Sequence, residues 1–108
     1  MVETGKKELV QHFTRKLIDV QTLRLVATQP MWGYKLKKLL EVKFGVRLRH
    51  GTLYPLLDRL EKRGLLLSER QRRHGRVRKI YALTAEGKRY LKTYRKLLQD
   101  QLSDIDLK

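Results

Sequence analysis

The feature that most restricts the fold of this chain is the order in which helix-like and strand-like hydrophobic spacings occur along it. Apolar residues recur at steps of three or four, the spacing of one helix face, from Glu8 to Thr28 and again from Gly33 to Phe44. Pro30 ends the first pattern, and Gly45 is a suitable left-handed terminator for the second. These patterns predict one long helix followed by a shorter one.

A third helix is expected to begin at Thr52 and to end near Arg63. Threonine is a good N-cap, and Pro55 would then lie in the first turn, where a missing N–H costs no helical hydrogen bond. One face of this helix is made of leucines: Leu53, Leu56, Leu57 and Leu60. The opposite face carries Tyr54, Pro55, Asp58, Arg59 and Lys62. The helix therefore has an apolar face for a core and a polar face for solvent or a partner.

The spacing then changes to that of β-strands. Leu65 to Arg70 and Val77 to Leu83 are predicted as two strands, separated by a polar tip, residues 71–76, whose glycine suits a hairpin turn. Because a two-stranded ribbon alone is marginally stable, it must pack on the helices. Thr84 can cap a last helix that starts at Ala85 and runs toward the C-terminus.

This order predicts a mainly α fold with a small antiparallel β-hairpin, that is, a winged helix-turn-helix with an added C-terminal helix. In that plan the last of three helices enters the major groove of DNA, which is about 12 Å wide and admits one helix, and the hairpin flanks it. A chain of 108 residues is the size of one domain. We expect residues of about 8–84 to form the DNA-binding module and about 85–108 to form a dimerisation helix.

The charge of the chain indicates the class of partner. The sequence has 26 Lys and Arg against 11 Asp and Glu, a formal net charge of +15. Such a charge favours nucleic acid through counterion release, although an acidic membrane surface would satisfy it as well. Basic side chains are concentrated in the hairpin, with no acid between them: Arg70, Arg72, Arg73, Arg76, Arg78 and Lys79. We therefore expect double-stranded DNA beside the hairpin.

Three ordered blocks of sequence resemble the PadR-like transcriptional regulators, and the resemblance runs from about Leu17 to Leu91. Residues 30–36 are similar to the family's Pro-x-x-Gly-Tyr start of the second helix. Residues 51–65, beginning Gly-Thr-Leu-Tyr-Pro, resemble its recognition helix, and residues 75–87 resemble its wing and the step into the last helix. Arg49 stands where the family commonly has a capping Ser, and Trp32 replaces a frequent His.

The resemblance implies a dimer in which the C-terminal helix of one subunit packs on its partner and two recognition helices face a pseudo-palindromic site. Members generally repress transcription, and some are relieved by small effector molecules; an effector for this chain is unknown. The short C-terminus is similar to the branch of the family with one such helix. Because the last helix contains no Trp, an aromatic drug-binding pocket is not carried over.

Two sets of candidate site residues follow. The DNA-binding set combines the second and third helices with the hairpin: Tyr34, Lys35, Thr52, Tyr54, Pro55, Arg59, Lys62, Arg72, Arg73, Arg76, Arg78 and Lys79. The dimer set is one stripe of the last helix: Leu91, Tyr94, Leu98, Leu102 and Ile105. Alternatives stay open for some of them. Tyr34 could instead lie in the core, Arg59 and Lys62 could be solvated helix charges, and the stripe could pack within its own subunit.

Other functional classes find little support in the sequence. There is no cysteine, and the three histidines lack metal-ligand spacing, so neither a metal nor another cofactor is expected. No catalytic arrangement or phosphate-binding loop can be placed, so an enzyme is not expected. Without a signal peptide or membrane span, we expect a cytoplasmic protein. The predicted function is sequence-specific DNA binding as a dimeric regulator, most simply a repressor, with an architectural DNA-binding protein of low specificity as the alternative.

Overall fold

The N-terminal half of the chain is helical and differs from the expected single long helix. A computed structural model describes the backbone of residues 2–108 and the side chains from residue 5 onward. It has α1 (Val2–Lys16) and α2 (Ile18–Thr28), with the interruption at Leu17, where φ is −112° and ψ is 38°. The prediction of one helix from Glu8 to Thr28 is therefore wrong. The apolar spacing runs through Leu17 without a change, so it could not reveal the bend.

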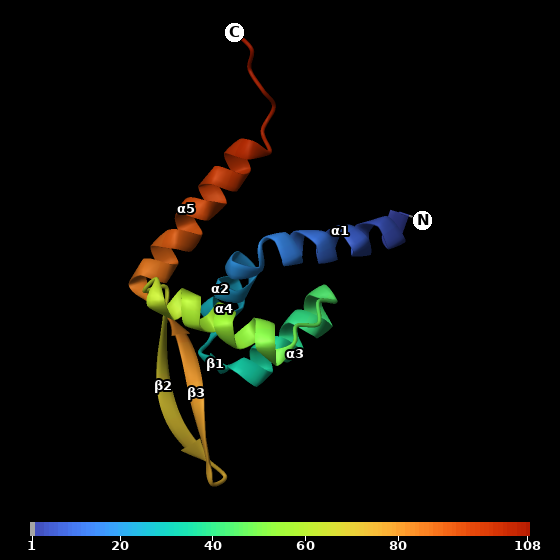
Figure 1. Ribbon diagram of the computed structural model, residues 1–108. Coiled ribbons are helices and arrows are strands. Elements are labelled where there is room, and N and C mark those ends of the chain that lie inside the picture. The colour runs from blue at the N-terminus through green and yellow to red at the C-terminus, as the bar shows by residue number, and fades with distance from the viewer. Residues whose placement is uncertain (1) are drawn as a thin grey trace.

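The bend separates a buried helix from an exposed one. Most of α2, including Leu23 and Val26, lies in the core, whereas Leu9 and Phe13 of α1 are 54% and 44% exposed. Figure 1 shows α1 leaving the body of the molecule. Its inner end is held by Gln11, whose Nε2 donates to the carbonyl oxygen of Gly45 at 3.2 Å.

Helices α3 (Gly33–Phe44) and α4 (His50–Lys62) follow. The expected bounds of α3 are confirmed, and Gly45 ends it with a φ of 69°. The expected start of α4 at Thr52 is wrong, because Arg49 takes the capping position and its carbonyl oxygen accepts from the N–H groups of Thr52 and Leu53. Pro55 therefore lies in the second turn. Gly51 is exposed, so water can reach the carbonyl that Pro55 cannot bond.

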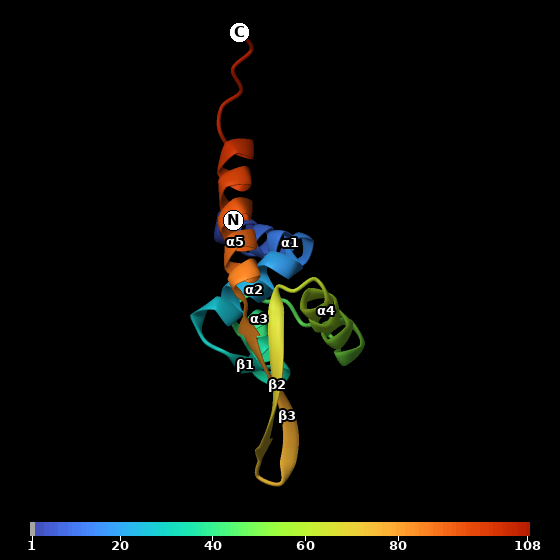
Figure 2. The ribbon, with the colours of Figure 1, turned by 90° about the vertical axis from the view of Figure 1, so that its left-hand side faces the viewer.

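A three-stranded antiparallel sheet completes the winged helix. Strand β3 (Arg76–Leu83) lies between β2 (Leu66–Arg73) and a short β1 (Met31–Trp32). Strands β2 and β3 form the wing and project from the helices (Figure 2). The wing is longer than expected, because a two-residue turn at His74 and Gly75, both with positive φ, replaces the predicted six-residue tip.

Strand β1 was not predicted from the sequence. Met31 pairs with Tyr81 and Trp32 pairs with Ile80, so this two-residue strand ties the wing to the start of α3. Strands this short carry no periodic signal, since alternation needs about four residues to be recognised.

The core lies where α2, α3, α4 and the sheet meet. The predicted leucine face of α4 is confirmed, since Leu53, Leu56, Leu57 and Leu60 are at most 1% exposed. They pack with residues of the other elements, among them Leu36 of α3 and Tyr81 of β3. The expected mainly α winged helix with a hairpin and a C-terminal helix is thus the observed fold.

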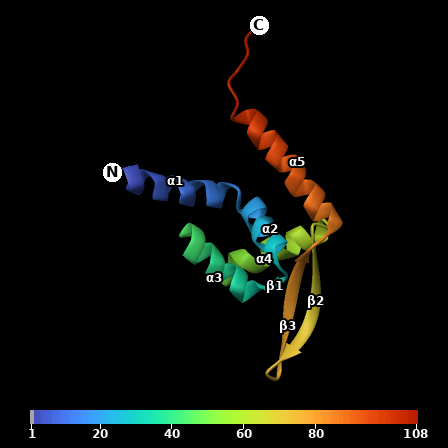
Figure 3. The ribbon, with the colours of Figure 1, turned by 180° about the vertical axis from the view of Figure 1, so that it is seen from behind.

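Helix α5 (Ala85–Gln101) starts as expected, because the hydroxyl of Thr84 accepts from the N–H of Gly87 at 2.9 Å. It ends earlier than expected: Leu102 is its C-cap, and Ile105 lies beyond the helix, so the idea of one helical stripe reaching Ile105 is wrong. The helix extends away from the body on the side opposite the wing (Figures 1 and 3). The molecule is accordingly elongated, with extents of 61 × 35 × 22 Å.

Candidate nucleic-acid interface

A groove of about 700 Å³ separates helix α4 from the wing. One wall is formed by His50, Tyr54 and Asp58 of α4, and the other by the first residues of β3, including Lys79. The start of α3 closes one end. The groove thus lies between the two elements that the sequence analysis assigned to DNA.

Tyr54 is held firmly at the edge of this groove. Its ring packs on Gly33 so closely that a Cβ added to Gly33 would lie 3.2 Å from both a ring carbon and the hydroxyl of Tyr54. On the other side the ring stacks on His50, with centroids 5.7 Å apart and an angle of 6° between the planes. Because the side chain is still 41% exposed, its position is set by packing while one edge stays accessible.

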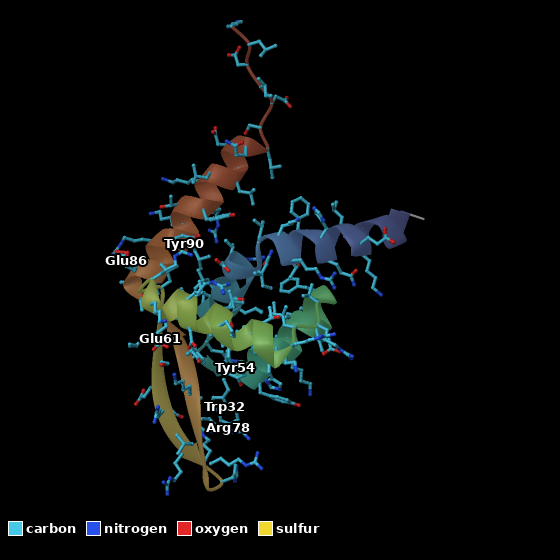
Figure 4. The ribbon with its side chains drawn as sticks, viewed as in Figure 1. Trp32, Tyr54, Glu61, Arg78, Glu86 and Tyr90 are labelled. Carbon is cyan, nitrogen blue, oxygen red and sulfur yellow. The ribbon has the colours of Figure 1, made fainter. Side chains whose placement is uncertain are left out.

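Trp32 contacts two arginines of the wing. The guanidinium carbon of Arg78 lies 4.5 Å from the ring centroid, and that of Arg73 lies 5.6 Å from it. Both distances are within the range of a cation–π interaction. Figure 4 shows Trp32 and Arg78 next to each other beside the hairpin. The indole therefore joins the wing to the body at a second point, beyond the β1–β3 pairing.

The basic residues of the wing lie on two faces rather than at one tip. Successive side chains of a strand alternate, so the pairing of β2 with β3 sorts them. Arg70, Arg72 and Lys79 share the face of Tyr81, which is directed toward the core and α4. Arg73, Arg76 and Arg78 share the other face, where Trp32 lies. The wing can therefore meet negative charge on either side.

The outward side of α4 and the start of α3 add polar groups beside the groove. Tyr34 is 62% exposed, so the alternative that it lies in the core is wrong. Of the other predicted DNA-binding residues, Arg78 is half-buried and the rest are exposed: Lys35, Thr52, Tyr54, Pro55, Arg59, Lys62, Arg72, Arg73, Arg76 and Lys79. The fold thus leaves the whole predicted set within reach of a ligand.

Tyr81 of β3 lines the groove and is buried. Burial raises the pKa of Tyr81 to about 12, and the nearby carboxylates of Asp58 and Glu61 act in the same direction. Glu61 in turn accepts a hydrogen bond of 2.5 Å from the hydroxyl of Ser68 on β2. The phenol of Tyr81 consequently keeps its proton at every physiological pH, and α4 is linked to the base of the wing.

The predicted dimer residues fall into two groups. Leu91 is half-buried and packs on the core of its own subunit, so for this residue the intramolecular alternative holds. Tyr94 and Leu98 are also half-buried, whereas Leu102 and Ile105 are 74% and 83% exposed. Apolar surface is therefore concentrated along the outer part of α5 and the segment that follows it.

Several neighbours of the groove and of α5 were not expected from the sequence. Nothing in the sequence pattern indicates that His50 stacks on Tyr54 or that Trp32 contacts Arg78. Leu9 and Phe13 of α1 belong to the apolar spacing that predicts one helix face from Glu8 to Thr28, yet both are exposed. Their exposure follows from the bend at Leu17, for which the sequence offers no signal.

None of the helices within residues 2–108 combines the length and the apolar character that a membrane crossing requires. Among the side chains that the structure describes, from residue 5 onward, histidines and acidic residues do not gather in groups that could hold a metal ion.

Comparison with known proteins agrees with this architecture. The sequence pattern of the "Transcriptional regulator PadR-like family" matches residues 22–93. The transcriptional regulator Rv3488 of Mycobacterium tuberculosis is 33% identical over 96 residues, which cover 89% of each chain. A PadR family transcriptional regulator from Eggerthella lenta superposes with a TM-score of 0.75 at 31% identity, over 93% of this chain and 88% of that one.

A PadR family transcription regulator from Clostridium difficile has a TM-score of 0.70 at 28% identity, over 76% of this chain and 86% of that one. The match of the family pattern includes α3, α4, the wing and the first half of α5. The chain therefore belongs to the PadR-like family, whose members are DNA-binding transcriptional regulators and not enzymes.

Proposed function

We propose that this regulator binds a defined DNA sequence as a homodimer and represses transcription from it. The observation that carries the proposal is the groove between α4 and the wing, with the exposed polar side of α4 on one wall and the basic, acid-free start of β3, Arg76 to Lys79, on the other. A helix in the major groove and a wing beside it leave one DNA strand to pass between them.

In this arrangement α4 selects the sequence. Tyr54 has the best-defined position on its exposed side, because Gly33 and His50 restrict the ring. Pro55 and Thr52 lie beside it, and Arg59 and Lys62 are one to two turns further along the helix, within reach of a phosphate. Tyr34 and Lys35, exposed at the start of α3, can contact the same strand of the backbone.

The wing supplies affinity that depends on salt. Arg72, Arg76 and Lys79 are exposed, and each phosphate they neutralise releases counterions. Arg73 and Arg78 are restrained by the indole of Trp32, so they hold the orientation of the wing as well as adding charge. We favour phosphate contacts over insertion into a narrow minor groove, because an arginine on a hairpin tip needs less exact placement to meet the backbone.

The dimer is proposed to form through Tyr94, Leu98 and Leu102 of α5, and the exposed side of α1 extends the apolar surface available to the partner. Leu97, Leu102 and Leu9 are each more than half exposed, and a second copy would remove them from water. Residues of about 8–84 would then serve DNA binding, and residues of about 85–108 would serve dimerisation. Helix α1 would contribute to dimerisation as well.

The test is selection of bound sequences from a random DNA pool, followed by affinity measurements on the recovered site and on random DNA at physiological salt. We expect a recovered sequence with two related halves and a preference for it of at least about a thousandfold. Equal affinity for both DNAs would overturn the proposal and favour a protein that coats DNA without specificity. Transcription from a promoter carrying the site, with and without the protein, then tests repression.

A further inference from the structure

The end of the recognition helix is joined to the start of α5 by a compact set of contacts, which we call the α4–α5 joint. It consists of Arg63, Gly64 and Leu65 on one side and Thr84, Gly87 and Tyr90 on the other. Figure 4 shows Tyr90 and Glu86 on the first turns of α5, next to the end of α4. None of these residues faces the groove described above.

The backbone part of the joint is tightly packed. The hydroxyl of Thr84 donates to the carbonyl oxygen of Gly64 at 2.6 Å and accepts from the N–H of Gly87 at 2.9 Å. The N–H of Thr84 also donates to the carbonyl oxygen of Leu65 at 3.2 Å. A Cβ added to Gly87 would collide with that same carbonyl oxygen. The first turn of α5 is therefore fixed directly on the segment that ends α4.

Arg63 forms the side-chain part of the joint. It is the residue that caps the C-terminal end of α4, and its guanidinium carbon lies 5.1 Å from the ring centroid of Tyr90 on α5. The same guanidinium contacts the carboxylate of Asp19 on α2 at 3.5 Å. One side chain thus connects the recognition helix, the C-terminal helix and a core helix.

The length of α5 makes this connection important. Its 17 residues span about 25 Å. A tilt of about 10° at the joint would move the far end by about 4 Å, more than the 3.4 Å that separates successive base pairs. If the outer part of α5 contacts a second copy, a small rotation at the joint changes the distance between two recognition helices by one base pair or more.

We propose that Arg63 is a positioning residue that sets the distance between the two recognition helices and so selects the half-site spacing. This inference rests on the proposed dimeric function. Arg63 acts through Tyr90 and Asp19 and does not need to touch DNA. Its loss leaves each recognition helix intact and loosens the angle of α5 against α4.

The experiment measures affinity for a series of DNA duplexes that carry the selected half-sites at spacings from two base pairs below the optimum to two above. The parent protein is expected to prefer its best spacing over the others by on the order of tenfold. Arg63→Ala should reduce this preference to about twofold to threefold. Affinity for a single half-site and the dimer mass in sedimentation should stay those of the parent.

Three further variants sharpen the result. Tyr90→Leu removes the ring face and should relax the spacing preference as Arg63→Ala does, and the double variant should add little to either. Arg63→Lys keeps a cation over Tyr90 and should restore part of the preference. Arg89→Ala removes an equal charge from the first turns of α5, where Arg89 pairs with Glu86 of the same helix, and should keep the parent's preference.

Two outcomes separate failure of this inference from failure of the proposed function. If the parent prefers one spacing and Arg63→Ala prefers it equally, the role of Arg63 is overturned and the dimeric function stands. If the parent binds all spacings equally, paired recognition is overturned and the role of Arg63 with it.

Discussion

The wing and the outer part of α5 both project from the body, on opposite sides, yet they expose different chemistry (Figure 2). The wing carries arginines and a lysine with no acid from Arg70 to Lys79, whereas α5 and the segment after it expose Leu97, Leu102 and Ile105. Exposed guanidinium groups are well solvated and gain from a nearby polyanion, while exposed leucines gain from a protein surface. This difference is the basis of our proposal that one side serves DNA and the other a second copy.

The largest expected effect comes from placing a charge on the apolar side. Leu98→Asp would bury an unpaired carboxylate in the proposed dimer at a cost of several kcal/mol, so the protein should become monomeric and lose cooperative DNA binding. Sedimentation measures the mass, and circular dichroism checks the fold. Lys96→Asp places a carboxylate on the side of the helix opposite Leu98 and should remain dimeric. A Leu98→Asp protein with the parent's mass would refute this assignment.

A change on the DNA-binding side should weaken DNA binding without changing the oligomeric state. Tyr54→Ala should weaken binding to the selected site by about 1 to 3 kcal/mol and leave the dimer intact. Tyr54→Phe keeps the packing on Gly33 and His50 and isolates the hydroxyl. If the phenylalanine variant binds like the parent, packing carries the effect; if the alanine variant does so as well with its fold intact, Tyr54 has no part in DNA binding.

The wing itself should act mainly through charge. Arg76→Ala should lower affinity for the selected site and for random DNA almost equally, and should flatten the plot of log affinity against log salt by about 0.9 for one lost phosphate contact. Salt titrations on both DNAs measure this slope. Arg89→Ala is the control, because Arg89 lies on α5, on the side of the molecule opposite the wing (Figure 1), and pairs with Glu86. Slopes equal to the parent's on both DNAs would exclude Arg76 from the contact.

The smallest expected effect concerns Tyr81 in the core of the molecule. It is a change in how the free energy of unfolding depends on pH. Since the pKa of Tyr81 rises to about 12 in the folded protein from an ordinary value of 10.0, the folded state holds this proton more tightly than the unfolded chain does. The resulting stability is complete below pH 10 and is lost as the pH rises toward 12, at roughly 1 kcal/mol per pH unit. Tyr81→Phe should show a shallower alkaline loss in urea unfolding. Equal pH slopes would show that burial does not hold this proton.

The helical core was predictable because its signals are local and repeated. The leucines of α4, the bounds of α3 and the cap at Thr84 each follow from spacing or capping within a few residues. The bend at Leu17 was not predictable, because the hydrophobic spacing continues across it and only tertiary packing distinguishes α1 from α2. The start of α4 was misplaced because Thr52 is a better cap by residue type than Arg49, which nevertheless occupies the position.

The identity of the basic residues in the site was predictable from the sequence, but their arrangement in space was not. Exposed basic residues in a hairpin can be recognised from composition, but their division between two faces requires the register of β2 and β3. The contact of Trp32 with Arg73 and Arg78 depends on a strand of two residues, too short to be seen in the sequence. Residues brought together by cross-strand pairing therefore remained hidden until the fold was known.

Trp32 also gives this protein an optical signal of its own. It is the single tryptophan of the chain, so all indole fluorescence comes from one position beside the groove. Two guanidinium groups lie over that ring, and their distances depend on how the wing is oriented against the body. Emission from the unlabelled protein therefore reports wing movement directly, and the arrival of DNA can be followed in time without attaching a dye to either molecule.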